Sequence, residues 1–196
     1  MTFNLRAGVV VESIKRARNG AGEPSWAHVS GWAQFSSGVR TVSCVIAAHN
    51  AAPRLARLLP DLSDLLTEGG FPWEITCIDS ASADQTTTLL SRWTEYPGFG
   101  WIRLALNYGE AAAVHTGLSH ARGDAVILVN AATDVSIERV PHMIAKWNQG
   151  DEVVYDNTER SQFMLLDRRM VNLMLRAEAD GCSTAAGAGS HLHRTC

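Results

Sequence analysis

The chain has 196 residues, of which 46% are hydrophobic, and a formal net charge of −3 at pH 7. That length and apolar content suit one globular domain with a sizeable core. The weak acidic excess argues against a nucleic-acid partner, which would need a concentrated basic face.

Residues 1–40 are rich in Gly, Ser and Ala, and we treat them as an N-terminal extension whose order the sequence does not decide. A regular pattern begins at Thr41, where the apolar run 41–48 predicts a strand. Leucines at helical spacing over 55–66 predict the first helix. Pro53 is expected near its start, Pro60 should kink it, and Gly69 and Gly70 should end it.

Four further apolar runs predict strands at 74–79, 101–106, 125–130 and 152–155. Helical patterns lie between them: one that Asp84 can cap, an Ala-rich helix over 110–122, and one that Ser136 can cap. Residues 162–177 run from an extended piece into a last helix. Residues 178–196 are small, polar and low in complexity, so we expect a disordered tail.

Strands that alternate with helices predict a single α/β domain over 41–177, with a mainly parallel sheet flanked by helices. We expect strands 41–48 and 74–79 to be parallel neighbours, with Cys44 and Cys77 buried. Ligands of such sheets bind outside the carboxyl ends of the strands. Polar residues follow four of the predicted strands there, and we expect them at one edge: Asn50, Asp79, Asn107 and Asn130.

The order of these motifs resembles family 2 glycosyltransferases of the GT-A (Rossmann-like) fold. The similarity covers about residues 41–175 and is greatest to the polyprenyl-phosphate hexosyltransferases, which include dolichol-phosphate mannosyltransferase. Five segments carry the resemblance: VIAAHNA (45–51), IDSASADQT (78–86), NYGEAAA (107–113), GLSHARGD (117–124) and QFMLLDRR (162–169).

Several positions depart from the family pattern. Ala51 stands where the family has Glu, Ser80 where it has Asp, and Glu110 where it has Lys. The family's D-x-D motif falls on Asn130-Ala131-Ala132, so both carboxylates are absent, and Gln162 replaces an Asp. Divalent cations such as Mg²⁺ prefer charged oxygen ligands.

By resemblance, the residues that would bind a nucleotide-sugar are His49, Asn50, Asp79, Asn107, Gly109 and Asn130. His49 could stack on a base, or be an inert loop residue. Asp79 could bond the base, or cap its own turn through the N–H groups of Ser82 and Ala83. Asp134 could replace the lost metal ligands, or share the capping of the following helix with Ser136. The sequence identifies no catalytic residue.

The resemblance implies a hexosyltransferase that uses a UDP- or GDP-sugar, with Mg²⁺ or Mn²⁺ as the cofactor unless the altered motif has lost it. The acceptor could be a polyprenyl phosphate at the membrane surface. The alternative is a catalytically inactive nucleotide-binding or scaffolding domain. A dinucleotide-binding oxidoreductase fits poorly, because the turn after residue 48 lacks the glycines that a pyrophosphate needs.

Cys44 and Cys77 lie in apolar runs, and no CxxC pair occurs, which favours a reducing, cytoplasmic location, free or at the membrane periphery. The sequence contains no stretch of about 18 apolar residues, so it predicts no transmembrane helix. Because charged metal ligands are missing, we expect nucleotide binding to be weak and nearly independent of a divalent cation.

Overall fold

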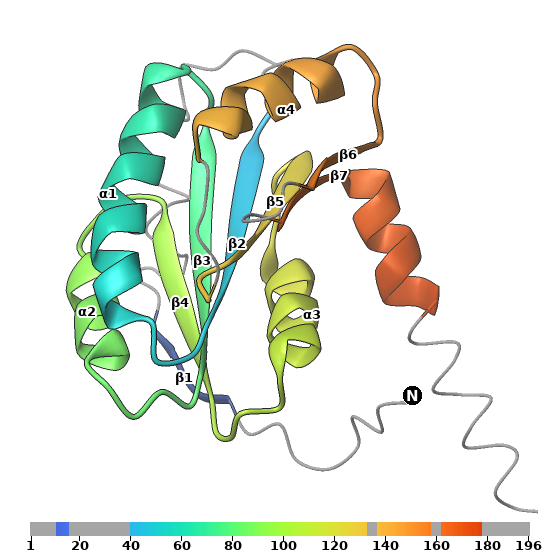
Figure 1. Ribbon diagram of the computed structural model, residues 1–196. Coiled ribbons are helices and arrows are strands. Elements are labelled where there is room, and N and C mark those ends of the chain that lie inside the picture. The colour runs from blue at the N-terminus through green and yellow to red at the C-terminus, as the bar shows by residue number, and fades with distance from the viewer. Residues whose placement is uncertain (1–10, 16–39, 133–136, 158–161, 178–196) are drawn as a thin grey trace, which may run out of the picture.

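A computed structural model describes residues 11–15, 40–132, 137–157 and 162–177. They form a seven-stranded sheet in the order β1-β4-β3-β2-β5-β7-β6, with helices on both faces (Figure 1). The strands are β1 Val11–Lys15, β2 Val42–Ala48, β3 Trp73–Ser80, β4 Phe99–Leu104, β5 Ala125–Asn130, β6 Val153–Asn157 and β7 Gln162–Asp167. The helices are α1 Ala52–Glu68, α2 Thr86–Trp93, α3 Glu110–His120 and α4 Val140–Asn148, with a short 3-10 turn, η3 Ile137–Arg139, before α4. A last helix, without a label in Figure 1, covers 168–177.

The four central strands are parallel, as the sequence predicts. β2 pairs with β3 and with β5, and β3 pairs with β4, all in parallel register. β1 and β7 flank them in antiparallel pairing, and β6 pairs antiparallel to β7. The expected α/β fold with helix-flanked central parallel strands is therefore confirmed, and β1 adds a strand from the segment that we treated as an extension.

Buried side chains alternate between the two faces of the sheet. Cys44 and Ile46 of β2 pack in the cluster that α1, α2 and α4 cover, whereas Val45 packs against α3 and the last helix. Both cysteines are fully buried, as predicted, and burial raises the pKa of the Cys44 thiol to about 12. These thiols are core residues with no accessible chemistry.

The helix boundaries agree closely with the sequence pattern. α1 ends before Gly69 and Gly70, as predicted, and it continues as one helix of 17 residues through Pro60. β4 begins two residues earlier than expected and ends at Leu104. The proposed helix cap Ser136 lies outside the described residues, as do the predicted disordered tail 178–196 and most of the extension.

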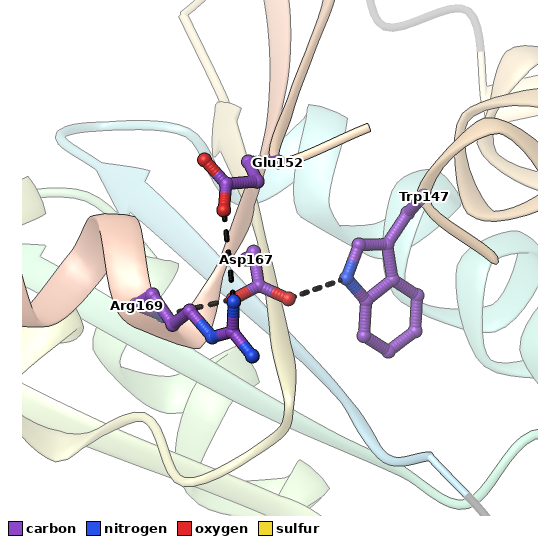
Figure 2. Close-up of polar contacts among 4 residues, drawn as sticks. All are labelled: Trp147, Glu152, Asp167 and Arg169. Carbon is purple, nitrogen blue, oxygen red and sulfur yellow. Dashed lines mark hydrogen bonds and ion pairs between the residues drawn. The ribbon is translucent and has the colours of Figure 1, made fainter. Parts of the chain in front are cut away.

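A polar cluster lies at the amino edge of the parallel strands, where Asp167 of β7 pairs with Ala125 at the start of β5. The indole Nε1 of Trp147 donates to Asp167 Oδ2 at 2.9 Å, and the Arg169 N–H donates to Asp167 Oδ1 at 2.9 Å (Figure 2). Arg169 also lies 3.9 Å from Glu152, but both of these side chains are largely exposed. The cluster joins α4 to the β7–helix junction on the side away from the carboxyl ends of the parallel strands.

Candidate functional site

Four turns follow the four parallel strands at one edge of the sheet. Register places Ala48 beside Asp79, and Ala47 beside both Ile78 and Asn130. On the other side of β3, Asp79 lies beside Arg103, which is near the end of β4. The predicted convergence of Asn50, Asp79, Asn107 and Asn130 at one edge is therefore confirmed.

Asn50 joins the turn after β2 to the turn after β3. Its Oδ1 accepts the N–H groups of Ala83 at 2.8 Å and Asp84 at 3.3 Å. Its own N–H donates to Ser82 Oγ at 2.9 Å. A left-handed backbone, with φ of 50°, turns Asn50 toward these partners, and Asn tolerates that conformation well. Asn50 thus fixes the spacing of two turns rather than projecting freely into solvent.

His49 has an exposed ring that these bonds orient. Nδ1 lies 2.8 Å from the Ser80 carbonyl oxygen, and Nε2 lies 3.1 Å from Asn50 Nδ2. A carbonyl oxygen only accepts and an amide nitrogen only donates, so this geometry assigns the proton to Nδ1. The result is an exposed imidazole whose orientation at the carboxyl edge of the sheet is fixed by these two contacts.

Asp79 is fully buried and anchors the turn that follows it. Its Oδ1 accepts the Ser82 N–H at 3.0 Å, and its Oδ2 accepts the Thr87 hydroxyl at 2.9 Å. Arg103 donates to the same hydroxyl at 2.9 Å. Of the two N–H groups that we expected Asp79 to cap, only that of Ser82 is bound, because Asn50 takes the Ala83 N–H. Both Asp79 oxygens are engaged, so this geometry corresponds to the turn-capping alternative.

Asp84 connects the starts of two helices. Its Oδ1 accepts the Thr86 N–H at 2.9 Å, and its Oδ2 accepts the Ala52 N–H at 3.2 Å. Burial raises the pKa of this carboxyl, but the hydrogen bonds from Thr86 and Ala52 outweigh burial and hold the pKa below its usual value. Asp84 thus binds the first N–H of α2, as the sequence suggested, although Gln85 occupies the N-cap position, and it also reaches the first residue of α1.

Asn107 and Gly109 form a local turn before α3. Asn107 Oδ1 accepts the Gly109 N–H at 2.9 Å, and Gly109 has a φ of 88°, which favours glycine. Glu110 follows as the first residue of α3 and is exposed. This turn shares the edge with the other three, and Asp79 and Arg103 lie between it and Asn50.

The turn after β5 does not offer a divalent-cation site in the part that the structure describes. Asn130 Oδ1 accepts the Ala132 N–H at 2.8 Å, and the two alanines contribute only backbone carbonyls. Arg54 Nη1 donates to both of those carbonyl oxygens, at 3.4 Å for Ala131 and at a short distance for Ala132. Across the described residues, no three His, Cys, Asp or Glu side chains group to hold a metal. The described donors therefore do not fit Mg²⁺ or Mn²⁺, and Asp134 lies outside the described residues.

Sequence reasoning missed Arg54, Thr87 and Arg103, which complete this edge. Thr87 and Arg103 lie outside the motif positions, and their spacing alone gives no signal for the bonds that they form. Arg54 lies in the first turn of α1, where its place in the chain, four residues after Asn50, could have indicated proximity to the site.

Known proteins resemble the chain in both sequence and fold. The family model described as glycosyl transferase family 2 matches residues 43–187. The undecaprenyl-phosphate 4-deoxy-4-formamido-L-arabinose transferase of Salmonella typhimurium is 29% identical over 143 residues, covering 70% of this chain and 44% of that protein. The chain thus spans less than half the length of the curated relatives it matches.

Two solved structures share the fold. A Pyrobaculum calidifontis mannosyltransferase, PcManGT, solved with GDP-Man and Mn²⁺, has a TM-score of 0.54 and 18% identity, covering 76% of this chain and 53% of that chain. The mannosyl-3-phosphoglycerate synthase of Rubrobacter xylanophilus has a TM-score of 0.52 and 16% identity, covering 66% and 54%. At such low identity these likenesses concern the fold alone. In the described ranges, no helix has the length and apolar character that a bilayer span requires.

Proposed function

The chain belongs to glycosyl transferase family 2, and from that membership we propose that it binds a nucleotide-sugar at the carboxyl edge of its sheet and transfers the sugar to a polyprenyl phosphate. The observation that carries the proposal is the bonded pair of turns after β2 and β3. There, the motif residues Asn50, Ser82 and Asp84 lie in one network with His49 exposed beside them. The donor is a UDP- or GDP-sugar.

The proposed donor site uses groups that are already oriented. The His49 ring stacks on the nucleotide base, and the Asn50 network holds that ring in place through its Nε2 bond. Asp79 acts from beneath as a positioning residue, since its two oxygens fix Ser82 and Thr87. The proposed site also includes Asn107 and Gly109 in the turn after β4, and Asn130 at the end of β5.

The proposed reaction suits a site without a strong base. A phosphate oxygen of the acceptor attacks the anomeric carbon, and the bond from that carbon to the diphosphate oxygen breaks, releasing the nucleoside diphosphate. An acceptor phosphate is already an anion, so no general base has to remove a proton. Gln162, which stands where the family has Asp, could not act as such a base. The name of the undecaprenyl-phosphate transferases that this chain resembles supports the acceptor class, and a lipid acceptor would place the protein at the membrane surface.

A second candidate is a nucleotide-binding domain that has lost transfer activity. The observation in its favour is the turn after β5, where Asn130 and two alanines replace the acidic motif. The negative charge that develops on the leaving diphosphate normally needs a cation or preorganised hydrogen-bond donors to stabilise it. Binding without turnover would identify this candidate.

The experiment titrates UDP and GDP calorimetrically, then measures transfer of labelled sugar from UDP- and GDP-sugars to undecaprenyl phosphate. His49→Ala is expected to weaken nucleotide binding by about threefold to tenfold, since stacking on one base contributes roughly 1 kcal/mol at an exposed site. His142→Ala, which removes an exposed histidine from α4, is the matched control and should bind as the unmodified protein does. Binding with no transfer would leave the inactive-domain candidate, and binding of neither nucleotide would refute both.

A further inference from the structure

Arg54 places a cation against the turn where the family holds its metal motif. The residue lies in the first turn of α1, and its guanidinium reaches the turn after β5, where Nη1 donates to the carbonyl oxygens of Ala131 and Ala132. The Ala131 N–H donates to the Ala47 carbonyl at 3.0 Å, which keeps this turn in register with the end of β2. Arg54 therefore joins the first turn of α1, which follows β2, to the turn after β5 at the edge that carries the proposed donor site.

The guanidinium keeps donors for a ligand. Arginine has five N–H groups in a planar fork, and the two carbonyls use those on Nη1. Within the described residues, Nη2 and Nε of Arg54 have no protein acceptor, and the side chain is exposed. An arginine fork with free donors matches the oxygens of a phosphate group, which it can bind in a bidentate way.

The same placement disfavours a divalent cation. The carbonyl oxygens that would remain as metal ligands after loss of the acidic motif are already bonded to a positive charge. A second cation at that turn would meet electrostatic repulsion without any carboxylate from the described residues to offset it. The altered motif and the arginine are thus consistent with each other.

We propose that Arg54 binds the diphosphate of the nucleotide-sugar and takes the place of the metal ion at this site. The inference rests on the proposed function, because it requires that a nucleotide bind at this edge. Arg54 then provides the positive charge that stabilises the diphosphate as the sugar leaves. It also keeps the turn after β5 in place through its carbonyl contacts.

The test separates phosphate binding from a purely structural role. UDP, GDP and the nucleosides uridine and guanosine are titrated into the unmodified protein, in EDTA and in Mn²⁺. We expect each diphosphate to bind equally well, within about twofold, in both conditions. Arg54→Gln should lower diphosphate affinity by about tenfold or more, as expected for loss of a charge-assisted pair, and leave nucleoside affinity unchanged. Arg54→Lys should restore part of the loss.

Arg57→Gln is the matched control, because it removes the same charge from an exposed arginine three residues further along α1. It should leave all four affinities unchanged. In the Arg54→Gln background, adding Asn130→Asp and Ala132→Asp should make diphosphate binding depend on Mn²⁺. Thermal unfolding of each variant verifies that the fold is retained.

Three outcomes would overturn the inference while leaving the proposed function in place. The first is diphosphate binding that requires Mn²⁺ and is lost in EDTA, which would indicate Asp134 as a ligand. The second is Arg54→Gln binding that equals that of the unmodified protein. The third is an equal loss for nucleosides and diphosphates, which would mean that Arg54 only supports the turn. Absence of any nucleotide binding would instead refute the proposed function, and the inference with it.

Discussion

Two residues of the candidate site have a left-handed backbone without being glycine: Asn50, with φ of 50°, and Ala81, with φ of 53°. Asn50 suits the conformation because its short amide bonds locally, here to the N–H groups of Ala83 and Asp84. Ala81 has no such compensation, because its methyl side chain forms no hydrogen bond. The turn after β3 therefore carries strain that its hydrogen bonds must offset.

Replacing Ala81 with Gly should relieve that strain. The left-handed conformation costs an L-residue about 1–2 kcal/mol, which glycine would not pay. Glycine also makes the unfolded chain more flexible, and this offsets about 0.4–1 kcal/mol of the stabilisation. We expect Ala81→Gly to raise the free energy of unfolding by about 0.5–1 kcal/mol in urea titrations. Ala83→Gly, two residues on and without a positive φ, is the control and should give no increase. Equal effects in the two variants would argue against backbone strain at Ala81.

At the residue scale, the sequence predicted which side chains gather at the edge, but only part of the hydrogen bonds that they form. Asn50, Asp79 and Asn130 follow apolar strands, so their convergence followed from parallel topology. Turn chemistry suggested the bond from the Ser82 N–H to Asp79, but the partners of the other N–H groups depend on turn geometry within a few tenths of an ångström, and no residue pattern encodes that. The same limit hid Arg54, whose partners are backbone carbonyls of a turn distant in sequence.

At the scale of elements, the packing of α3 on β2 depends on one glycine. An added Cβ at Gly117 would lie 2.1 Å from Val45 Cγ1, and Val45 is fully buried in the middle of β2. A β-branched side chain in a packed core has one preferred rotamer and little room to turn. The close approach of this helix to the sheet therefore requires Gly at this position.

We expect Gly117→Ala to destabilise the fold although alanine is the better helix former. The propensity gain is about 1 kcal/mol, and overpacking costs typically about 1–3 kcal/mol, with a 2.1 Å contact at the severe end. The expected net loss is about 1–2 kcal/mol in the free energy of unfolding, measured with urea. Gly100→Ala in β4 is the control, because no atom lies within 4 Å of its added Cβ.

A double-mutant cycle tests the cause of this loss. Val45→Ala removes the methyl groups that the new Cβ would meet, so Gly117→Ala should cost less in that background. An undiminished cost would refute steric conflict with Val45 as the reason.

Elements with strong apolar runs were predicted well, and those without were not. Strand β2 is entirely buried, and β3 and β5 are mainly buried, so the approximate limits of all three follow from composition. β1 has the sequence VESIK, which contains no strong apolar run. It pairs antiparallel to β4 at the edge of the sheet, so its strand conformation depends on that neighbour. The order of strands depends on pairings between distant segments, and local pattern does not reveal them.

At the scale of the whole molecule, the two edges of the sheet have different tasks. The carboxyl edge carries the candidate site, whereas polar bonds at the amino edge tie the C-terminal part of the domain to the parallel strands. There, Arg168 Nε donates to the Gly123 carbonyl at 2.8 Å, and the Trp147–Asp167 bond joins α4 to β7. Loss of the amino-edge bonds should weaken the fold without altering the site directly.

Asp167 makes part of this stability depend on pH. Burial raises the pKa of its carboxyl, but the Trp147 N–H bond outweighs that effect, together with the Arg169 N–H and the charges of Arg169 and Arg40. The folded pKa thus lies below the ordinary 3.8. A carboxyl whose pKa is depressed by folding contributes stability above its unfolded pKa, and that contribution disappears as the pH falls through the folded value.

Asp167→Asn should therefore lower the free energy of unfolding at pH 7, where the unmodified carboxylate is ionised in both states. The difference between the two proteins should shrink as the pH falls from about 5 through 3.8 and below, because protonation removes the advantage of the carboxylate. Urea titrations at half-unit steps of pH measure this, with Asp61→Asn on the exposed face of α1 as the control for net charge. The reason is structural: an asparagine oxygen can still accept the Trp147 N–H, but it lacks the charge that draws in Arg169 and Arg40. A difference that stays constant across this range would show that the loss comes from altered packing at the junction of α4 and β7, and that ionised Asp167 makes no special contribution.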